Sequence, residues 1–113
     1  MNVTTTDNGR ISLVRVGETR VMYPMLADFS SAVTALVAAG KRDIVIDLTP
    51  VTYVDSATIG CLMDLYRQIQ GAGGALKLSG VQKRVETMLT LTGAQNFIEI
   101  HPDEASAVKS FGV

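Results

Sequence analysis

Residues 43–60 read DIVIDLTPVTYVDSATIG, and this stretch decides the fold. It opens with an almost unbroken apolar run at residues 44–48, which is typical of a central strand covered on both faces. Pro50 ends this strand, which we expect over residues 43–49. After a short connection, Asp55-Ser56 leads into a segment whose apolar residues recur at helical spacing. A buried strand followed closely by an amphipathic helix predicts an alternating α/β domain.

The segments on either side continue this alternation. Two runs rich in Val, Thr and Ile flank Asn8-Gly9, a pair suited to a tight turn, and predict an N-terminal β-hairpin. Apolar residues at helical spacing, with glycine or proline at the ends, indicate the helices. The predicted strands are residues 2–7, 11–16, 43–49, 75–79 and 97–100, and the predicted helices begin near Leu26, Asp55-Ser56, Val81 and Pro102. The predicted order is β-β-α-β-α-β-α-β-α, with a mixed sheet and about four helices.

The length and charge of the chain narrow its function. The chain has 113 residues, a length typical of one domain, and we expect residues 1–113 to form it. Ten Lys and Arg residues against eleven Asp and Glu residues leave a net charge of −1 without a basic cluster, so nucleic acid is not an expected partner. The sequence shows no signal peptide and no apolar run near the roughly 18 to 20 residues of a membrane span. We therefore expect a cytoplasmic protein that does not insert into membranes.

Groups that perform catalysis or bind metals are scarce. His101 has no second His and no Cys near it in the sequence, so we expect a surface or capping role. Cys61 lies among apolar residues of the second predicted helix, where a small buried thiol is expected. Asp47 resembles the phosphoacceptor of receiver domains by position, but the acidic pair and the lysine of such a site are missing. We expect Asp47 to cap a turn or to pair with Lys41 or Arg42, and we expect no enzymatic activity, cofactor or metal.

The start of the second predicted helix is the most informative site. Either Asp55 or Ser56 is suited to cap it, because both side chains accept hydrogen bonds from the free N–H groups of a first helical turn. Ser56 is also a candidate phosphorylation site, since a phosphate there would meet those N–H groups and the positive end of the helix dipole. The local pattern alone favours a capping role.

The stretch at residues 43–60 and the later run ALKLSGVQKRVETMLTLTG, residues 75–93, resemble the STAS domain of bacterial anti-sigma factor antagonists. The resemblance covers almost the whole chain and is strongest at Asp55-Ser56, where the family has an Asp followed by a phosphorylated Ser or Thr. Gly17-Glu18 is similar to the family's Gly-Glu after the second strand. The chain departs from the family at Thr58, where many members have Gly, and at Thr19-Arg20, where members have an apolar residue and Asp.

The resemblance implies a regulatory binding protein without enzymatic activity of its own. In the family scheme, the unmodified antagonist binds an anti-sigma factor that is also a serine kinase, and the sigma factor is released. The kinase uses ATP to phosphorylate the antagonist, which weakens the complex, and a serine phosphatase restores it. Carried over to this chain, Ser56 is the acceptor, Asp55 its acidic neighbour, and Thr58 a second, less favoured acceptor. The alternative is a constitutive STAS interaction subunit of a sensory scaffold or of a lipid-transport complex.

A docking face for the partner follows from this scheme. We expect it to surround the acceptor and to extend to residues upstream of the first helix, where Met side chains suit an adaptable contact. Core packing is the alternative for these upstream residues. The predicted face comprises Tyr53, Val54, Asp55, Ser56, Ala57 and Thr58, extended by Met22, Tyr23 and Met25. A phosphate with a charge of about −1.5 to −2 within this face would have to be desolvated on binding.

Overall fold

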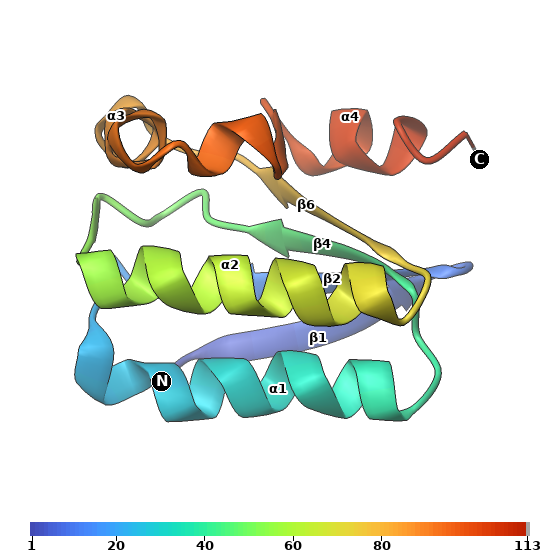
Figure 1. The fold of residues 1–113 in the computed structure, drawn as a ribbon. Helices are drawn as coiled ribbons and strands as arrows, with labels where there is room; N and C mark the ends of the chain where they lie inside the picture. The colour runs from blue at the N-terminus through green and yellow to red at the C-terminus, as the bar shows by residue number, and fades with distance from the viewer. Residues whose placement is uncertain (113) are drawn as a thin grey trace.

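A computed structural model describes residues 1–112, and these residues form a main sheet of five strands in the order β1-β2-β4-β6-β7 (Figure 1). β1 and β2 form an antiparallel hairpin that turns at Gly9, and every other neighbouring pair is parallel. The strands are β1 (Val3–Asn8), β2 (Ile11–Val16), β4 (Asp43–Asp47), β6 (Ala75–Ser79) and β7 (Glu99–His101). The predicted mixed sheet with an N-terminal hairpin is confirmed.

The four α-helices of residues 1–112 are α1 (Leu26–Ala38), α2 (Ser56–Gly71), α3 (Lys83–Thr92) and α4 (Glu104–Lys109). α1 and α2 lie side by side on one face of the sheet, which we call the front face, and α4 packs against the opposite, back face (Figure 1). The predicted α/β class and the order of the main elements are confirmed. The last strand begins at Glu99, later than predicted, because a 3-10 turn at Ala94–Asn96 precedes it.

A second, two-stranded sheet positions the site described below. β3 (Arg20–Val21) and β5 (Tyr53–Val54) pair in parallel, and the N–H of Thr52 donates a hydrogen bond of 2.7 Å to the carbonyl oxygen of Thr19. The sequence predicts neither strand, because two residues are too few to show a strand period. Their pairing holds the chain before α1 beside the chain before α2.

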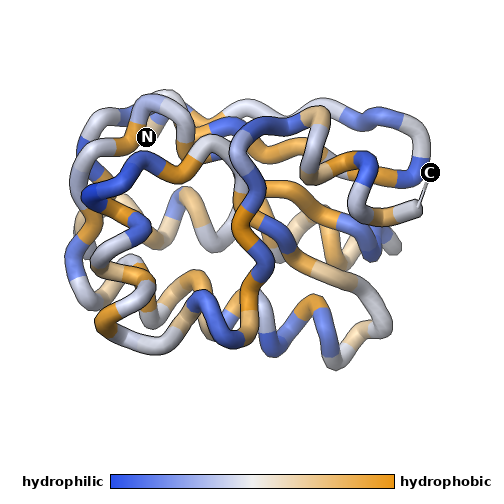
Figure 2. The backbone as a smooth tube through the Cα atoms, turned by 90° about the horizontal axis from the view of Figure 1, so that it is seen from above, coloured by the Kyte–Doolittle hydropathy of each residue, from blue (hydrophilic) through white to orange (hydrophobic). Residues whose placement is uncertain are grey.

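The core is divided unequally between the two faces of the sheet. Ile44 and Ile46 of β4 are fully buried in a large apolar cluster on the front face, whereas Val45 lies in a smaller cluster beneath α4. β4 is therefore covered on both faces, as its apolar run predicts. The helices alternate between hydrophobic and hydrophilic residues along their length, as amphipathic helices do (Figure 2).

The turn after β6 requires a glycine. Gly80 has a φ of +67°, and a Cβ atom there would clash with Oγ1 of Thr49 and lie 3.0 Å from Oδ1 of Asp47. Gly40, after α1, also has a positive φ of +90°, but the space around it is open. Gly80 therefore meets both a conformational and a packing requirement at the junction between β6 and α3.

Candidate functional site

Asp55 is the N-cap of α2. Its backbone is extended, with φ −92° and ψ 175°, and its Oδ1 atom accepts a hydrogen bond of 2.9 Å from the N–H of Thr58. Its Oδ2 atom accepts a second bond of 2.9 Å from the N–H of Tyr23, in the segment before α1. Of the two predicted capping residues, the structure uses Asp55, and this one carboxylate joins the starts of both front-face helices.

The same contacts keep the Asp55 carboxylate charged. The pKa of Asp55 lies below its ordinary value, chiefly because the Thr58 hydroxyl donates to the carboxylate and also because the backbone N–H groups of Tyr23 and Thr58 do so. A negative charge at this position also interacts favourably with the dipole of α2. The N–H of Thr58 is thus capped without any contribution from Ser56.

The hydroxyls of Ser56 and Thr58 differ in their accessibility. Ser56 is the first residue of α2, its side chain is exposed, and its hydroxyl has no hydrogen-bond partner within residues 1–112. Thr58 is only 3% exposed, and its hydroxyl lies 2.9 Å from the carbonyl oxygen of Val21 and 2.6 Å from Oδ1 of Asp55. The side chain of Ser56 is therefore open to solvent, whereas the hydroxyl of Thr58 is accessible only after these contacts break.

The other residues of the predicted docking face differ in exposure. Tyr23 is 72% exposed and Tyr53 is 41% exposed, so both present an aromatic ring to solvent. Val54 is 1% exposed and packs into the front-face core. Three further members of the face are half-buried: Met22, Met25 and Ala57. The structure therefore exposes the side chains of Tyr23 and Tyr53 near the Asp55 cap, with Ser56 exposed beside it.

A pocket of about 190 Å³ lies next to Tyr53 and is lined by Thr52, Tyr53, Val54, Arg84 and Met88. The guanidinium of Arg20 lies over the Tyr53 ring, 4.9 Å from the ring centroid. The sequence does not predict Arg84 and Met88 as site residues, because they come from α3 and only the packing of α3 against β5 brings them here. Arg20 stands out in the sequence solely as a departure from the family pattern.

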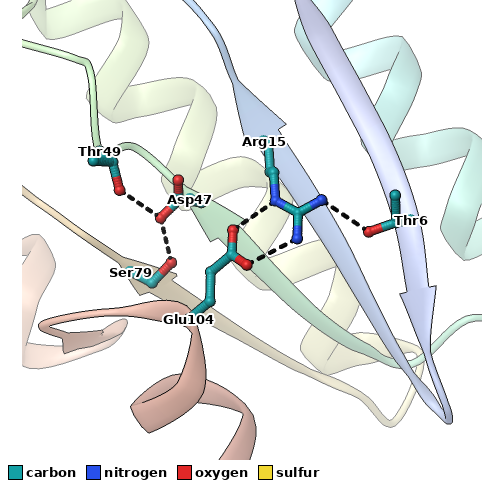
Figure 3. Close-up of polar contacts among 6 residues, drawn as sticks. All are labelled: Thr6, Arg15, Asp47, Thr49, Ser79 and Glu104. Carbon is teal, nitrogen blue, oxygen red and sulfur yellow. Dashed lines mark hydrogen bonds and ion pairs between the residues drawn. The ribbon is translucent and has the colours of Figure 1, made fainter.

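A buried carboxylate lies at the end of β4, on the back face of the sheet. Oδ1 of Asp47 accepts hydrogen bonds of 2.9 Å from the Thr49 hydroxyl and 2.8 Å from the Ser79 hydroxyl (Figure 3). Lys41 pairs with Asp7 at 3.2 Å, and Arg42 donates to backbone oxygens. Of the two roles predicted for Asp47, pairing with Lys41 or Arg42 is therefore wrong, and the carboxylate instead holds the turn that follows β4.

Arg15 links the sheet to the last helix near this carboxylate. It donates two hydrogen bonds to the carboxylate of Glu104 in α4, at 2.8 and 2.9 Å, and a third of 3.1 Å to the Thr6 hydroxyl (Figure 3). The guanidinium of Arg15 is thus bonded to both carboxylate oxygens of Glu104 and to the hydroxyl of Thr6. This arrangement fixes α4 on the back face.

The remaining reactive side chains have structural surroundings. Nε2 of His101 lies 3.0 Å from Oε1 of Glu99. Cys61 is half-buried, and burial, reinforced by the nearby Asp64, raises the pKa of its thiol, which disfavours the reactive thiolate. Residues 1–112 contain no group of three or more His, Cys, Asp or Glu side chains arranged to hold a metal ion.

None of the helices in this part of the chain has the length and apolar character needed to span a membrane.

These features define a small α/β domain with an exposed, unbonded hydroxyl at the start of a helix that the neighbouring Asp55 caps. The STAS domain family model matches residues 2–107, so the chain belongs to the STAS domain family. The predicted family is thereby confirmed, and the curated relatives that the chain matches include anti-sigma-B factor antagonists.

One relative and two solved structures illustrate the likeness. The chain is 24% identical over 101 residues to the anti-sigma-B factor antagonist of Staphylococcus aureus, which covers 89% of this chain and 93% of that protein. An anti-sigma factor antagonist structure from Mycobacterium paratuberculosis superimposes with a TM-score of 0.87 at 20% identity, covering 96% of this chain and 92% of that one. The phosphorylated form of the Bacillus protein SpoIIAA gives a TM-score of 0.76 at 12% identity, covering 97% and 99%. At these identities, the two structures show a shared fold.

Proposed function

We propose that this protein is an anti-sigma factor antagonist that is switched off by phosphorylation of Ser56. In its unmodified form it binds an anti-sigma factor, itself a serine kinase, and a sigma factor is released. Phosphorylation by that kinase, with ATP, weakens the complex, and a serine phosphatase reverses the modification. The protein acts in the cytoplasm as a binding module with no catalytic activity of its own.

The observation that carries this proposal is the exposed, unbonded hydroxyl of Ser56 directly after the Asp55 cap. Asp55 satisfies the N–H of Thr58, and the preceding amides of the first turn have no acceptor within the helix. A phosphate on Ser56 would meet these amides and the helix dipole, which contributes about 0.3 to 1 kcal/mol per charge. Repulsion from the charged Asp55 opposes this gain, so phosphorylation leaves the fold nearly unchanged and acts on partner binding.

The physical basis of the switch is desolvation. A phosphoserine carries a charge of about −1.5 to −2, and a partner seated on Tyr23, Tyr53 and the first turn of α2 would have to exclude water from it. A loss of about 3 kcal/mol would weaken the complex more than a hundredfold. The known phosphorylated form of SpoIIAA, which shares this fold, supports a phosphorylation switch.

Phosphorylation of the intact protein tests the proposal. We expect incubation with the cognate anti-sigma factor kinase and ATP to add one phosphate to the wild type and none to Ser56→Ala, as measured by intact mass. Ser31→Ala is the matched control, because Ser31 is an exposed serine of α1, and it should be phosphorylated like the wild type. A phosphate that maps to Thr58, or a mass that never changes, contradicts the assignment of Ser56.

Ser56→Asp separates the proposal from its alternative. We expect this variant to bind the anti-sigma factor at least about a hundredfold more weakly than the wild type, by calorimetry. A constitutive subunit of a sensory scaffold or of a lipid-transport complex would instead co-purify with its partners equally well in both forms.

A further inference from the structure

The pocket beside Tyr53 has the size and lining of a site for one apolar side chain. Its floor includes Val54, which is 1% exposed, and Met88, which is half-buried, while the Tyr53 ring stands partly exposed beside it. An engineered apolar cavity of about 150 Å³ holds a benzene molecule, so a pocket of about 190 Å³ accommodates a side chain such as leucine. Unbranched, polarizable Met side chains adapt well to such a contact.

The charges around this pocket are positive and uncompensated. Arg84 lines the pocket and Arg20 lies over the Tyr53 ring, and neither has a carboxylate within 4 Å in residues 1–112. Arg15, Lys41, Arg67 and Lys77 are paired with carboxylates, whereas Arg10, Arg42, Lys83 and Lys109 have no such partner in residues 1–112 either. The carboxylate that follows the pocket in sequence, Asp55, is already engaged by Tyr23 and Thr58. One unpaired guanidinium group, that of Arg84, therefore lines an apolar hollow, and a second, that of Arg20, lies over the Tyr53 ring that forms part of its wall.

We infer that this pocket binds an acidic segment of the partner protein, with one apolar side chain in the hollow and flanking carboxylates paired with Arg20 and Arg84. Charge complementarity selects this occupant, because guanidinium groups bind carboxylates by strong, charge-assisted hydrogen bonds. A basic segment would place its charges against the two arginines. The inference rests on the proposed function, since it identifies the chemistry of the partner surface that meets the Ser56 site.

An acidic partner segment also explains the direction of the switch. Ser56 is three residues from Tyr53, so their Cα atoms are at most about 11 Å apart, close to the Debye length of about 10 Å at 0.1 M salt. A phosphate on Ser56 would repel the carboxylates of the segment and attract the same arginines. Both effects weaken the complex, in addition to the cost of desolvating the phosphate.

Peptide binding tests the inference without the kinase. The probes are two synthetic peptides with a central leucine, flanked on each side by two glutamates in one and by two lysines in the other, titrated at low salt into the isotope-labelled protein. We expect the glutamate peptide to shift the NMR amide signals of Tyr53, Val54, Arg84 and Met88, and the lysine peptide to leave them unchanged. Equal shifts with both peptides, shifts confined to other surfaces, or no shifts overturn the inference.

Two variants test the role of charge. Arg84→Glu should bind the glutamate peptide at least about tenfold more weakly, because an ion pair is replaced by repulsion. Arg10→Glu makes the same charge change at an exposed residue of the β1–β2 turn and should bind like the wild type. Equal weakening in both variants would mean a non-specific charge effect and would overturn the inference.

The peptide experiment tests the acidic segment, and the phosphorylation experiment tests the proposed function, so either proposal can fail without the other. A protein that is phosphorylated on Ser56 but does not bind the glutamate peptide refutes the acidic segment alone. A protein that binds the peptide at this pocket but is never phosphorylated refutes the switch alone.

Discussion

Asp55 and Ser56 are sequence neighbours with different tasks at the start of α2. Both carboxylate oxygens of Asp55 accept backbone N–H groups, one within α2 and one from Tyr23. The hydroxyl of Ser56 makes no such bond and faces solvent. Removing the acceptors of Asp55 should therefore weaken the fold, while changes at Ser56 should leave its stability nearly unaltered.

Replacement of Asp55 should destabilise the protein in a pH-dependent way. The lowered pKa of Asp55 means that its charge contributes stability above the unfolded pKa of about 3.9, and this stability is lost as the pH falls through the folded value. We expect Asp55→Asn to lower the free energy of unfolding by about 0.5 to 1.5 kcal/mol at neutral pH, because an amide has one acceptor oxygen and leaves the N–H of either Tyr23 or Thr58 without its bond. The difference from the wild type should shrink below about pH 4, as measured by urea unfolding.

Asp28→Asn is the control for this measurement. Asp28 is also an acid near the start of a front-face helix, but its side chain is 74% exposed and lies 3.5 Å from the N-terminal amine. Its replacement should have little effect at either pH. A stability difference for Asp55→Asn that stays constant from neutral to acidic pH would contradict the assigned role of the charge.

At the scale of elements, the junction between β6 and α3 decides where α3 lies. Gly80 turns the chain next to Asp47 and Thr49, whose side chains are hydrogen-bonded to each other. α3 then packs against β5 and carries Arg84 and Met88 to the pocket beside Tyr53. The geometry of one glycine turn therefore affects the docking surface.

Gly80→Ala should be markedly destabilising. Alanine at a positive φ costs roughly 1 to 2 kcal/mol, and at this position its Cβ atom also clashes with Thr49. Gly40→Ala meets only the first penalty, because the space around Gly40 is open. We expect Gly80→Ala to lose about 1 to 3 kcal/mol more than Gly40→Ala in urea unfolding. Equal losses would show that the close approach to Thr49 does not matter.

At the scale of the whole molecule, most of the stability comes from the front-face core. α1, α2 and α3 all contribute buried residues to it, whereas the back face is covered by the short α4 and a small apolar cluster. Side chains on the front face should therefore control global unfolding. Apolar residues outside the two clusters should contribute little.

Two leucines on helices test this division. Leu62 of α2 is 1% exposed within the front-face core, and Leu91 of α3 is 79% exposed. We expect Leu62→Ala to lower the free energy of unfolding by about 2 to 5 kcal/mol, because it leaves a cavity in a packed core. Leu91→Ala should change it by less than about 0.5 kcal/mol. Similar losses in both variants would contradict the core described for this protein.

Long periodic segments are the part of this fold that the sequence predicts well. The apolar run of β4 and the amphipathic pattern of α2 each follow from local spacing, as does the N-terminal hairpin, although its turn lies at Gly9-Arg10 and not at the predicted Asn8-Gly9 because Asn8 still pairs with Ile11. The two-residue strands β3 and β5 have no detectable period. The site was predicted only in its local part, the Asp55-Ser56 helix start, because the contacts of Asp55 with Tyr23 and of Tyr53 with Arg20 join segments that are distant in sequence.

Asp55 caps α2 and Ser56 does not, so the two positions should tolerate sequence variation differently. Because the cap belongs to Asp55, position 56 imposes almost no requirement of its own on folding. Most residue types should be tolerated there in a saturation library sorted for folded protein, including proline, which suits the first position of a helix. A strong preference for one residue type at this position in a screen for activity would then report regulation rather than stability.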